Sequence, residues 1–175
     1  MKLIGLTGTN GSGKGEAALF FQKNGFAYFS LSDVIRDELN REGRPLSRDN
    51  LIQRGNRLRK DHGADVLARR VMSGIRSDAV IDSIRNLREV EYFRRRPGFI
   101  LLALDAPPEI RFQRIRERGR RESAVTLEEF ILKEREEMTE KETGQQLALC
   151  MAAADYQIVN DGSLDDLHRR LEKFL

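Results

Sequence analysis

The segment Gly8-Thr9-Asn10-Gly11-Ser12-Gly13-Lys14 has the composition and spacing of a loop that binds phosphate. It matches the pattern G-x-x-x-x-G-K, in which glycines allow backbone N–H groups to turn toward one anion. A helix that begins at the end of the loop adds its positive dipole, and Lys14 adds a mobile cation for the terminal phosphates. A strand pattern precedes the loop and a helix pattern follows it, which disfavours a glycine-rich turn without a ligand.

The two residues after the lysine depart from the general motif. Gly15 occupies the position where Ser or Thr commonly ligates magnesium, and Glu16 follows it. The Glu16 carboxylate would lie near the α-phosphate of a bound nucleotide, or it would point outward as a first-turn acid that the helix dipole favours. The sequence therefore predicts ATP binding through Gly8 to Gly15, with weak or altered ATP use as an alternative.

Further charged side chains follow apolar runs. Asp82 ends one such run, and the carboxyl ends of parallel strands form the edge where these sheets bind ligands. We expect Asp82 to hold Mg²⁺ through water, with a cap on the next helix as the alternative. Arg36 follows Ser32 and Asp33 at the start of an earlier predicted helix, and Arg is suited to bidentate phosphate contacts. The alternative is that Ser32 or Asp33 caps this helix while Arg36 faces solvent.

A set of arginines recurs in the second half of the chain. Arg111, Arg114 and Arg118 are three and four residues apart, so they share one face of a predicted helix. Arg120 follows closely. Phosphoryl transfer is catalysed mostly by positioning and by cations near the equatorial oxygens, and Arg114, Arg118 and Arg120 could supply that charge. A solvated stripe of charge is the alternative.

Short apolar runs alternate with helical patterns along the chain, which is typical of a parallel α/β fold. The runs predicted as strands are 2–7, 26–30, 79–82, 99–104 and 155–159. The patterns predicted as helices are 14–23, 33–42, 48–62, 64–74, 88–95, 107–118, 127–142, 145–153 and 164–174. Because 37–77 contains helical patterns and no strand, we interpret it as an insertion in one domain that spans 1–175.

Composition limits the classes of partner. The 175 residues include 31 basic and 28 acidic side chains, a net charge of +3 that gives no case for nucleic-acid binding. No run approaches the ~20 apolar residues of a membrane span, and the N-terminus has no signal-peptide core. We therefore expect a cytoplasmic protein without membrane contact. Cys150 is the sole cysteine and is expected to be buried.

These segments together resemble the nucleoside monophosphate kinases, such as adenylate kinase, and the related dephospho-CoA kinases. Gly15 matches the loops G-K-G-T of that branch, and 29–36 resembles the segment that opens its acceptor-binding helix. The segment 79–86 resembles a family strand that ends in Asp-Gly-Phe-Pro-Arg, although Ser and Ile replace Gly and Phe and no proline precedes Arg85. Residues 154–163 resemble the last strand and turn of dephospho-CoA kinase.

The resemblance implies a three-layer P-loop fold: a five-stranded parallel sheet, helices on both faces and a helical acceptor-binding insertion. It implies a lid at about 119–126 and an acceptor phosphate held by Arg36 and Arg85, with Ser32 and Asp33 beside them. It also places the adenine of ATP near the turn Asn160-Asp161-Gly162, which otherwise needs no ligand because such turns precede capped helices.

The function that follows is ATP- and Mg²⁺-dependent phosphorylation of a small-molecule acceptor, a nucleoside or deoxynucleoside monophosphate. Dephospho-CoA kinase is the second interpretation, supported by the opening Ile4-Gly5-Leu6-Thr7-Gly8 and the turn near the C-terminus. A third belongs to another class: a regulatory protein that binds a nucleotide without transferring phosphate, a reading that Glu16 and the short lid motivate.

Overall fold

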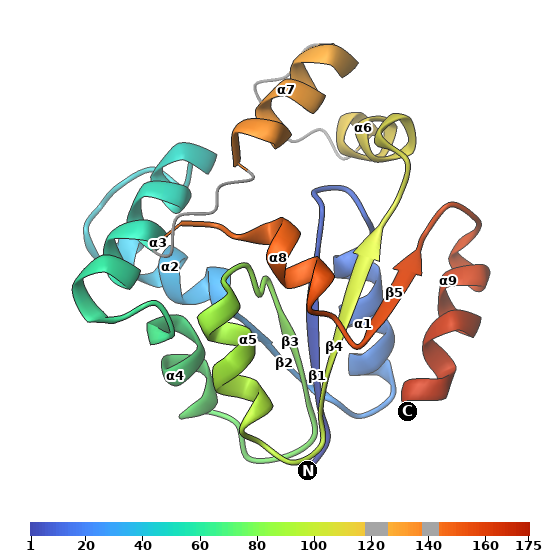
Figure 1. The fold of residues 1–175 in the computed structure, drawn as a ribbon, viewed down its shortest axis with the longest axis horizontal. Coiled ribbons are helices and arrows are strands. Elements are labelled where there is room, and N and C mark those ends of the chain that lie inside the picture. Colours follow the sequence, from blue (N-terminus) through green and yellow to red (C-terminus); the bar gives the residue numbers. More distant parts are fainter. Residues whose placement is uncertain (118–125, 138–143) are drawn as a thin grey trace.

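The computed structural model describes residues 1–117, 126–137 and 144–175. Its strands form one parallel five-stranded sheet in the order β2-β3-β1-β4-β5 (Figure 1). The strands are β1 (Leu3–Gly8), β2 (Ala27–Ser30), β3 (Ala79–Asp82), β4 (Phe99–Asp105) and β5 (Tyr156–Val159). The parallel sheet confirms the α/β class that alternating apolar runs and helical patterns predict.

Helices connect the strands in every crossover. They are α1 (Lys14–Lys23), α2 (Leu31–Arg41), α3 (Arg48–His62), α4 (Val66–Met72), α5 (Leu87–Arg94), α6 (Pro108–Glu117), α7 (Leu127–Glu137), α8 (Leu147–Ala152) and α9 (Leu164–Leu171), followed by a short 3₁₀ turn, η1 (Glu172–Phe174). Their bounds differ from the sequence prediction by a few residues. The residues at 118 and 138–142, which were predicted to end two of these helices, lie outside the described part of the chain.

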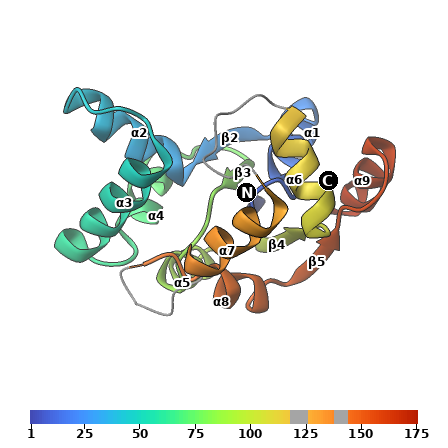
Figure 2. The same cartoon turned by 90° about the horizontal axis from the view of Figure 1, so that it is seen from above.

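Two separate apolar cores hold the layers together. Ile4, Leu6 and Phe21 belong to the core beneath α1 and α9. Leu3, Phe93 and Leu101 belong to the opposite core, beneath α2 to α5 and α8. Successive residues of a strand point to opposite faces, so Leu3 and Ile4 divide between the two cores. Seen from above, α1 and α9 lie on one side of the sheet, and α5 and α8 lie on the other (Figure 2). The expected three-layer arrangement is therefore confirmed.

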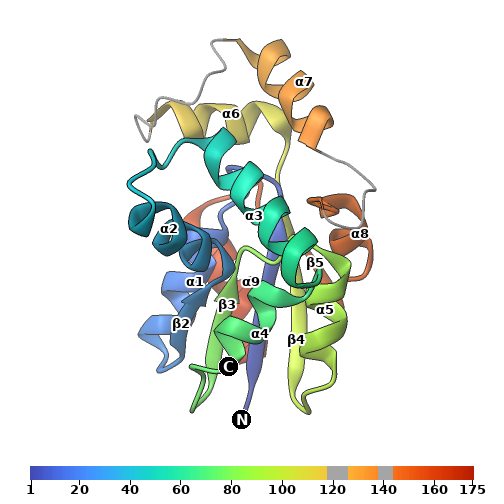
Figure 3. The same cartoon turned by 90° about the vertical axis from the view of Figure 1, so that its left-hand side faces the viewer.

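The connection between β2 and β3 consists of α2, α3 and α4, which lie at the left of Figure 1 and therefore at the front of Figure 3. Helix α2 begins at Leu31, directly after β2, and its N-cap is Ser30. Ser32 and Asp33 therefore lie inside the first turn, and the alternative that one of them is the N-cap is wrong. Ser47 caps α3 by accepting the N–H of Asn50, and Gly63 ends the helix with a φ of 96°.

Strand β1 lies at the centre of the sheet, between β3 and β4. Its last residue, Gly8, pairs with Leu104 of β4, and on the other side Asp82 of β3 pairs with Ser30 of β2. The carboxyl ends of all strands face the same way, and α6 and α7 lie above this edge (Figure 1). The fold thus brings the loop after β1, the end of β3 and helix α6 to one edge.

Candidate active site

The loop after β1 is held in a conformation that only glycine adopts without strain. The φ angles of Gly8, Gly11 and Gly13 are 137°, 78° and 100°. A Cβ atom on Gly8 would lie 1.9 Å from the carbonyl oxygen of Leu104, and one on Gly13 would lie 2.2 Å from Nδ2 of Asn160. The loop therefore packs against its neighbours through its backbone. The loop is followed directly by α1, whose first residue is Lys14.

Lys14 lies over this loop. Its Nζ donates to the carbonyl oxygens of Gly8, at 2.9 Å, and Thr9, at 2.6 Å. Burial and the charge of Arg85 lower the pKa of Lys14 to about 8, whereas the charge of Asp82 acts in the opposite direction. An anion bound to the loop would offset the cost of burying the Lys14 ammonium group, because its negative charge would pair with that group.

Side chains from three other elements hold the loop in place. The Thr9 hydroxyl donates to Oδ1 of Asp105, at the end of β4, over 2.6 Å. Asn160, after β5, donates through Nδ2 to the carbonyl oxygen of Ser12 over 2.9 Å. The Ser12 hydroxyl itself is buried and has no hydrogen-bond partner among the described residues, which fits a ligand oxygen as its partner.

Arg111 on α6 is the third support. Its side chain is 4% exposed and donates to the carbonyl oxygens of Ala106, at 2.7 Å, and Asn10, at 3.3 Å. It also forms a bidentate ion pair with Glu134 of α7, in which NH1 and NH2 each donate to one carboxylate oxygen. The alternative of a solvated arginine stripe is therefore wrong for Arg111, which links the phosphate loop to α7.

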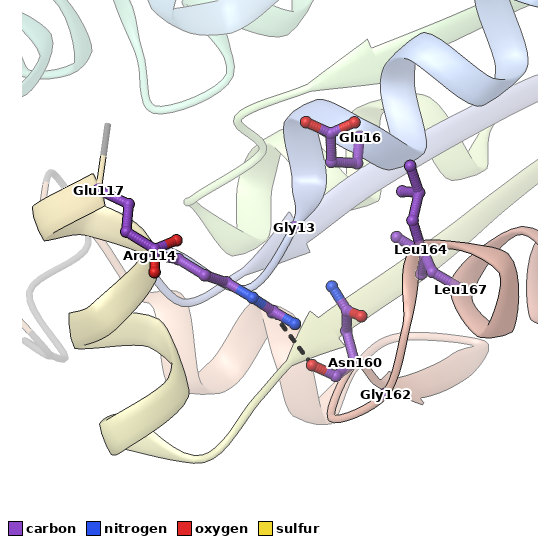
Figure 4. Close-up of a pocket in the computed structure, with 8 residues that line it drawn as sticks. All are labelled: Gly13, Glu16, Arg114, Glu117, Asn160, Gly162, Leu164 and Leu167. Atoms are coloured by element: carbon purple, nitrogen blue, oxygen red, sulfur yellow. Dashed lines mark hydrogen bonds between the residues drawn. The ribbon is translucent and has the colours of Figure 1, made fainter. Parts of the chain in front are cut away.

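A pocket opens beside the loop, between α6 and the segment after β5 (Figure 4). Its volume is about 340 Å³, within the range of small-ligand sites. It is lined by Gly13, Glu16, Arg114, Glu117, Asn160, Gly162, Leu164 and Leu167. Two leucines thus form an apolar wall, while NH1 of Arg114 donates to the carbonyl oxygen of Asn160 over 3.1 Å. Asp161, in contrast, is exposed and pairs with Arg170 over 3.4 Å, so it is absent from this lining.

Glu16 lines the pocket from the first turn of α1 (Figure 4). The half-buried Glu16 side chain lies beside Gly13, where the loop meets α1.

The turn Asn160-Asp161-Gly162 is followed by helix α9. Ser163 caps this helix in a capping box with Asp166, which confirms the capped helix expected after the turn.

On the other side of β1, the end of β3 forms a tight turn. Oδ1 of Asp82 accepts the N–H of Ser83 over 2.6 Å. Ser83 has a φ of 65°, the one left-handed residue other than glycine in the described chain. Ser83 therefore adopts a conformation suited to glycine, at the position where the nucleoside monophosphate kinases have glycine. The next helix, α5, is capped by Asn86, so the alternative that Asp82 caps it is wrong.

The arginines predicted to bind an acceptor lie on two elements that flank this turn. Arg36 of α2 donates to Oγ of Ser32, at 2.8 Å, and pairs with Asp33 at 2.5 Å. Arg85 follows the turn and donates to Oε1 of Gln145 over 2.9 Å. Burial and the charge of Asp82 raise the pKa of Tyr28 on β2, and Arg36 acts on the same hydroxyl in the opposite direction.

The structure therefore brings most of the predicted site to one edge. Asp82 and Arg85 both lie within electrostatic reach of Lys14, and Ser32, Asp33 and Arg36 lie on α2, which follows the strand paired with Asp82. Arg118 and Arg120 lie outside the described residues. The same holds for the predicted lid at 119–126, apart from residue 126. In the described ranges, no three His, Cys, Asp or Glu side chains gather as a metal site. Asp82 fits Mg²⁺ as a single carboxylate, because Mg²⁺ commonly uses one or two carboxylates together with substrate phosphates and waters.

Sequence reasoning missed Asp105 and Asn160 as supports of the loop and Arg111 as its link to α7. Asp105 could have been found, because it ends an apolar run as Asp82 does. The roles of Asn160 and Arg111 depend on contacts across 148 and 101 residues, for which the sequence carries no local signal.

Comparison with known proteins agrees with this arrangement. Shikimate kinase from Acinetobacter baumannii, solved in complex with shikimate, superposes with a TM-score of 0.62 at 19% identity, over 99% of this chain and 92% of that one. A sugar kinase from Janibacter sp. superposes with a TM-score of 0.53 at 17% identity, over 99% and 94%. The protein thus has the fold of the small P-loop kinases.

The sequence itself matches a narrower group. Residues 4–145 match the family model described as AAA domain. A UPF0200 protein of Pyrococcus horikoshii is 33% identical over 180 residues, which cover 98% of this chain and 94% of that protein. The chain therefore belongs to the AAA-domain family and to the UPF0200 proteins. In the parts of the chain that the structure describes, no helix combines the length and apolar character needed to cross a membrane.

Proposed function

We propose that this protein transfers the terminal phosphoryl group of ATP to a nucleoside or deoxynucleoside monophosphate. The observation that carries the proposal is the convergence of Lys14, Asp82 and Arg85 beside the phosphate loop. Lys14 would bind the donor phosphates, Asp82 would hold a metal ion, and Arg85 would bind the acceptor phosphate. The P-loop kinase fold supports the reaction class, and the arginines support the choice of a phosphorylated acceptor.

On the donor side, the amides of the loop from Gly8 to Gly15, with the backbone of Asn10 and the Ser12 hydroxyl, would bind the ATP phosphates. Lys14 would leave the carbonyl oxygens that it now contacts and neutralise the transferred phosphoryl group. The base would enter the 340 Å³ pocket, against Asn160 and Gly162. When bound, Mg²⁺ withdraws charge from the phosphate oxygens, and Asp82 would hold it.

On the acceptor side, Arg36 and Arg85 would bind the phosphate of the monophosphate, assisted by Ser32. At neutral pH this phosphate is largely a dianion, since its second pKa is about 6. An ionised oxygen can attack the γ-phosphorus while the bond to the bridging oxygen breaks, so the site needs no general base. Arg114, with Arg118 and Arg120, would neutralise the charge that develops in transfer.

The test measures ADP release from Mg·ATP with purified protein. The panel holds the common ribo- and deoxynucleoside monophosphates, dephospho-CoA, shikimate and gluconate. We expect release that depends on one or a few monophosphates, and an Arg36→Met variant that loses it. Release with dephospho-CoA alone would favour the second interpretation. Release only with an acceptor that lacks phosphate would contradict the proposed acceptor while leaving the phosphotransferase class in place.

A nucleotide-binding regulator without transfer is the second candidate, and Glu16 favours it. This carboxylate lines the pocket next to Gly13, where it opposes an anionic ligand. Tight ATP binding by calorimetry, together with no release for any acceptor, would support the regulator. Release that depends on an acceptor would exclude it.

A further inference from the structure

A buried ion pair lies between the insertion and the turn after β3. Arg59 of α3 and Glu89 of α5 have side chains that are 3% and 0% exposed. Nε and NH2 of Arg59 both donate to Oε1 of Glu89, over 3.0 and 2.8 Å. Removing two charges from water costs about as much as their attraction returns, so a buried pair of this kind is weak evidence for stability. Its geometry points instead to a positioning role.

The second carboxylate oxygen of Glu89 holds the backbone of the turn after β3, residues 83–86 (the acceptor turn). Oε2 accepts the N–H groups of Arg85 and Asn86, each over 3.0 Å. One carboxylate therefore joins helix α3 of the insertion to the peptide units that carry Arg85. Among the described residues, its hydrogen bonds come from the Arg59 side chain and from the turn, and each oxygen accepts two of them.

Arg85 is also held from the opposite side. Its carbonyl oxygen accepts the N–H of Gln146 over 2.7 Å, and its NH1 group donates to Gln145 over 2.9 Å. Nδ2 of Asn86 donates to the carbonyl oxygen of Gly144 over 3.0 Å. The orientation of Arg85 is thus fixed by the carboxylate on one side and by residues 144–146 on the other. The guanidinium remains within electrostatic reach of Lys14.

We propose that Arg59 and Glu89 are positioning residues that set Arg85 for the anionic group of the acceptor. This inference rests on the proposed function, because it assigns Arg85 to the acceptor phosphate. Without Arg59, Glu89 is a buried carboxylate without its counter-ion; it must take up a proton or admit water, and either change loosens the turn. Arg85 then loses its orientation, whereas the phosphate loop keeps all of its supports.

The functional test compares Arg59→Met and Arg59→Lys with a matched control, Arg57→Met. Arg57 lies on the same helix, but its side chain is 65% exposed and pairs with Asp61. We expect Arg59→Met to raise the KM for the acceptor monophosphate at least tenfold and to leave the Kd of ATP within twofold. Arg59→Lys should lie between, because it keeps the charge and loses the fork. For the matching nucleoside without phosphate, binding should not change.

A double variant, Arg59→Met with Glu89→Met, separates positioning from general stability. It removes both buried charges, so its Tm should recover relative to Arg59→Met, while the high acceptor KM should persist because the turn has lost its carboxylate. Recovery of both quantities would overturn the proposal, as would an equal loss of ATP and acceptor binding in Arg59→Met. If Arg59→Met does not fold, Arg59→Lys and the double variant provide the same comparison.

Amide hydrogen exchange tests the inference without any acceptor. In the ligand-free protein, the amides of Arg85 and Asn86 should exchange at least tenfold faster in Arg59→Met than in the wild type, and Arg57→Met should leave them unchanged. Unchanged exchange at both amides would overturn the positioning role whatever the acceptor is. Faster exchange in a protein that binds no monophosphate would uphold the positioning role and reject the proposed function.

Discussion

The two sides of β1, which we propose as the donor side and the acceptor side, are built by different means. The donor side is formed by backbone: three glycines with positive φ, a helix N-terminus and one lysine. The acceptor side is formed by side chains from α2, α3, α5 and the segments before α5 and α8, which make hydrogen bonds and ion pairs. A backbone site needs a short contiguous motif, whereas a side-chain site needs several distant segments. The donor side should therefore tolerate no change at Gly8, Gly11 or Gly13, and the acceptor side should respond to changes far from the ligand.

The largest effect is expected at the one side chain on which the donor side depends. Lys14→Ala should lower turnover by about 10³-fold, because the developing charge loses its main cation. The fold should persist, since among the described residues Nζ of Lys14 donates its hydrogen bonds to carbonyl oxygens of the loop and not to a helix or strand outside it. Turnover is measured by ADP release and the fold by thermal unfolding. Lys23→Ala, in the last turn of α1, is the control; equal turnover in Lys14→Ala and wild type would contradict the donor assignment.

A pair of glycines tests the backbone nature of the donor side. Gly8→Ala should lower the free energy of unfolding by about 3 kcal/mol, because the new Cβ would lie 1.9 Å from a β4 carbonyl oxygen at a positive φ. In Gly15→Ala the new Cβ has no atom of the described residues within 4 Å, so a gain of about 0.5–1 kcal/mol from helix propensity is expected. Urea unfolding measures both. A similar loss in both variants would mean that general helix or loop effects, and not this close approach, control the site.

This difference explains what the sequence could predict. The phosphate loop, the strands and Asp82 follow from local patterns: spacing, apolar runs and the ends of runs. Arg36 and Arg85 followed from a resemblance, and the structure places Arg36 on α2 and Arg85 in the segment between β3 and α5. No local pattern marks Arg59 and Glu89, because a buried ion pair across 30 residues has the same composition as a solvated one.

Burial also separated residues that the sequence treated as equivalent. Arg111 and Arg114 share a helix and a spacing rule, yet Arg111 is enclosed by Glu134 and the loop, while Arg114 lines the pocket. Asn160 and Asp161 share a turn, but only Asn160 touches the phosphate loop. Helix periodicity and turn composition fix neither depth nor partner, so such distinctions required the fold.

Glu16 is the exception on the donor side, because a side chain opposes the ligand there. Glu16→Gln keeps the shape and removes the charge, and it should tighten ATP binding by about fivefold, since one like-charge interaction near the surface amounts to about 1 kcal/mol. Calorimetry at low and high salt measures this gain, which should shrink at high salt. Glu172→Gln, at the exposed end of the chain, is the control. Weaker ATP binding in Glu16→Gln would mean that the carboxylate accepts hydrogen bonds from the nucleotide.

The pH dependence of ATP binding tests the state of Lys14. With a pKa of about 8 in the free protein, Lys14 is about three-quarters neutral at pH 8.5. Bound polyphosphate favours the ammonium form and raises the pKa, so ATP binding should take up a proton at pH 8.5 and weaken as pH rises through 8. Calorimetry in buffers of different ionisation enthalpy measures the uptake. Lys14→Arg remains charged and should show none; equal uptake in that variant would assign the proton to another group.

The smallest effect is expected on the acceptor side, at the turn that carries Arg85. Ser83 has a φ of 65°, which costs a residue with a Cβ about 1–2 kcal/mol, and glycine removes that cost while it adds entropy to the unfolded chain. Ser83→Gly should therefore raise the free energy of unfolding by about 0.5–1 kcal/mol. Ser77→Gly, at an exposed position with an ordinary φ, should lower it by a similar amount. Opposite signs in thermal unfolding would locate the strain in the backbone of the turn; a loss in both would mean that the Ser83 side chain stabilises the turn more than its conformation costs. If Ser83→Gly gains stability but loses acceptor affinity with ATP binding unchanged, the strained turn contributes to the orientation of Arg85.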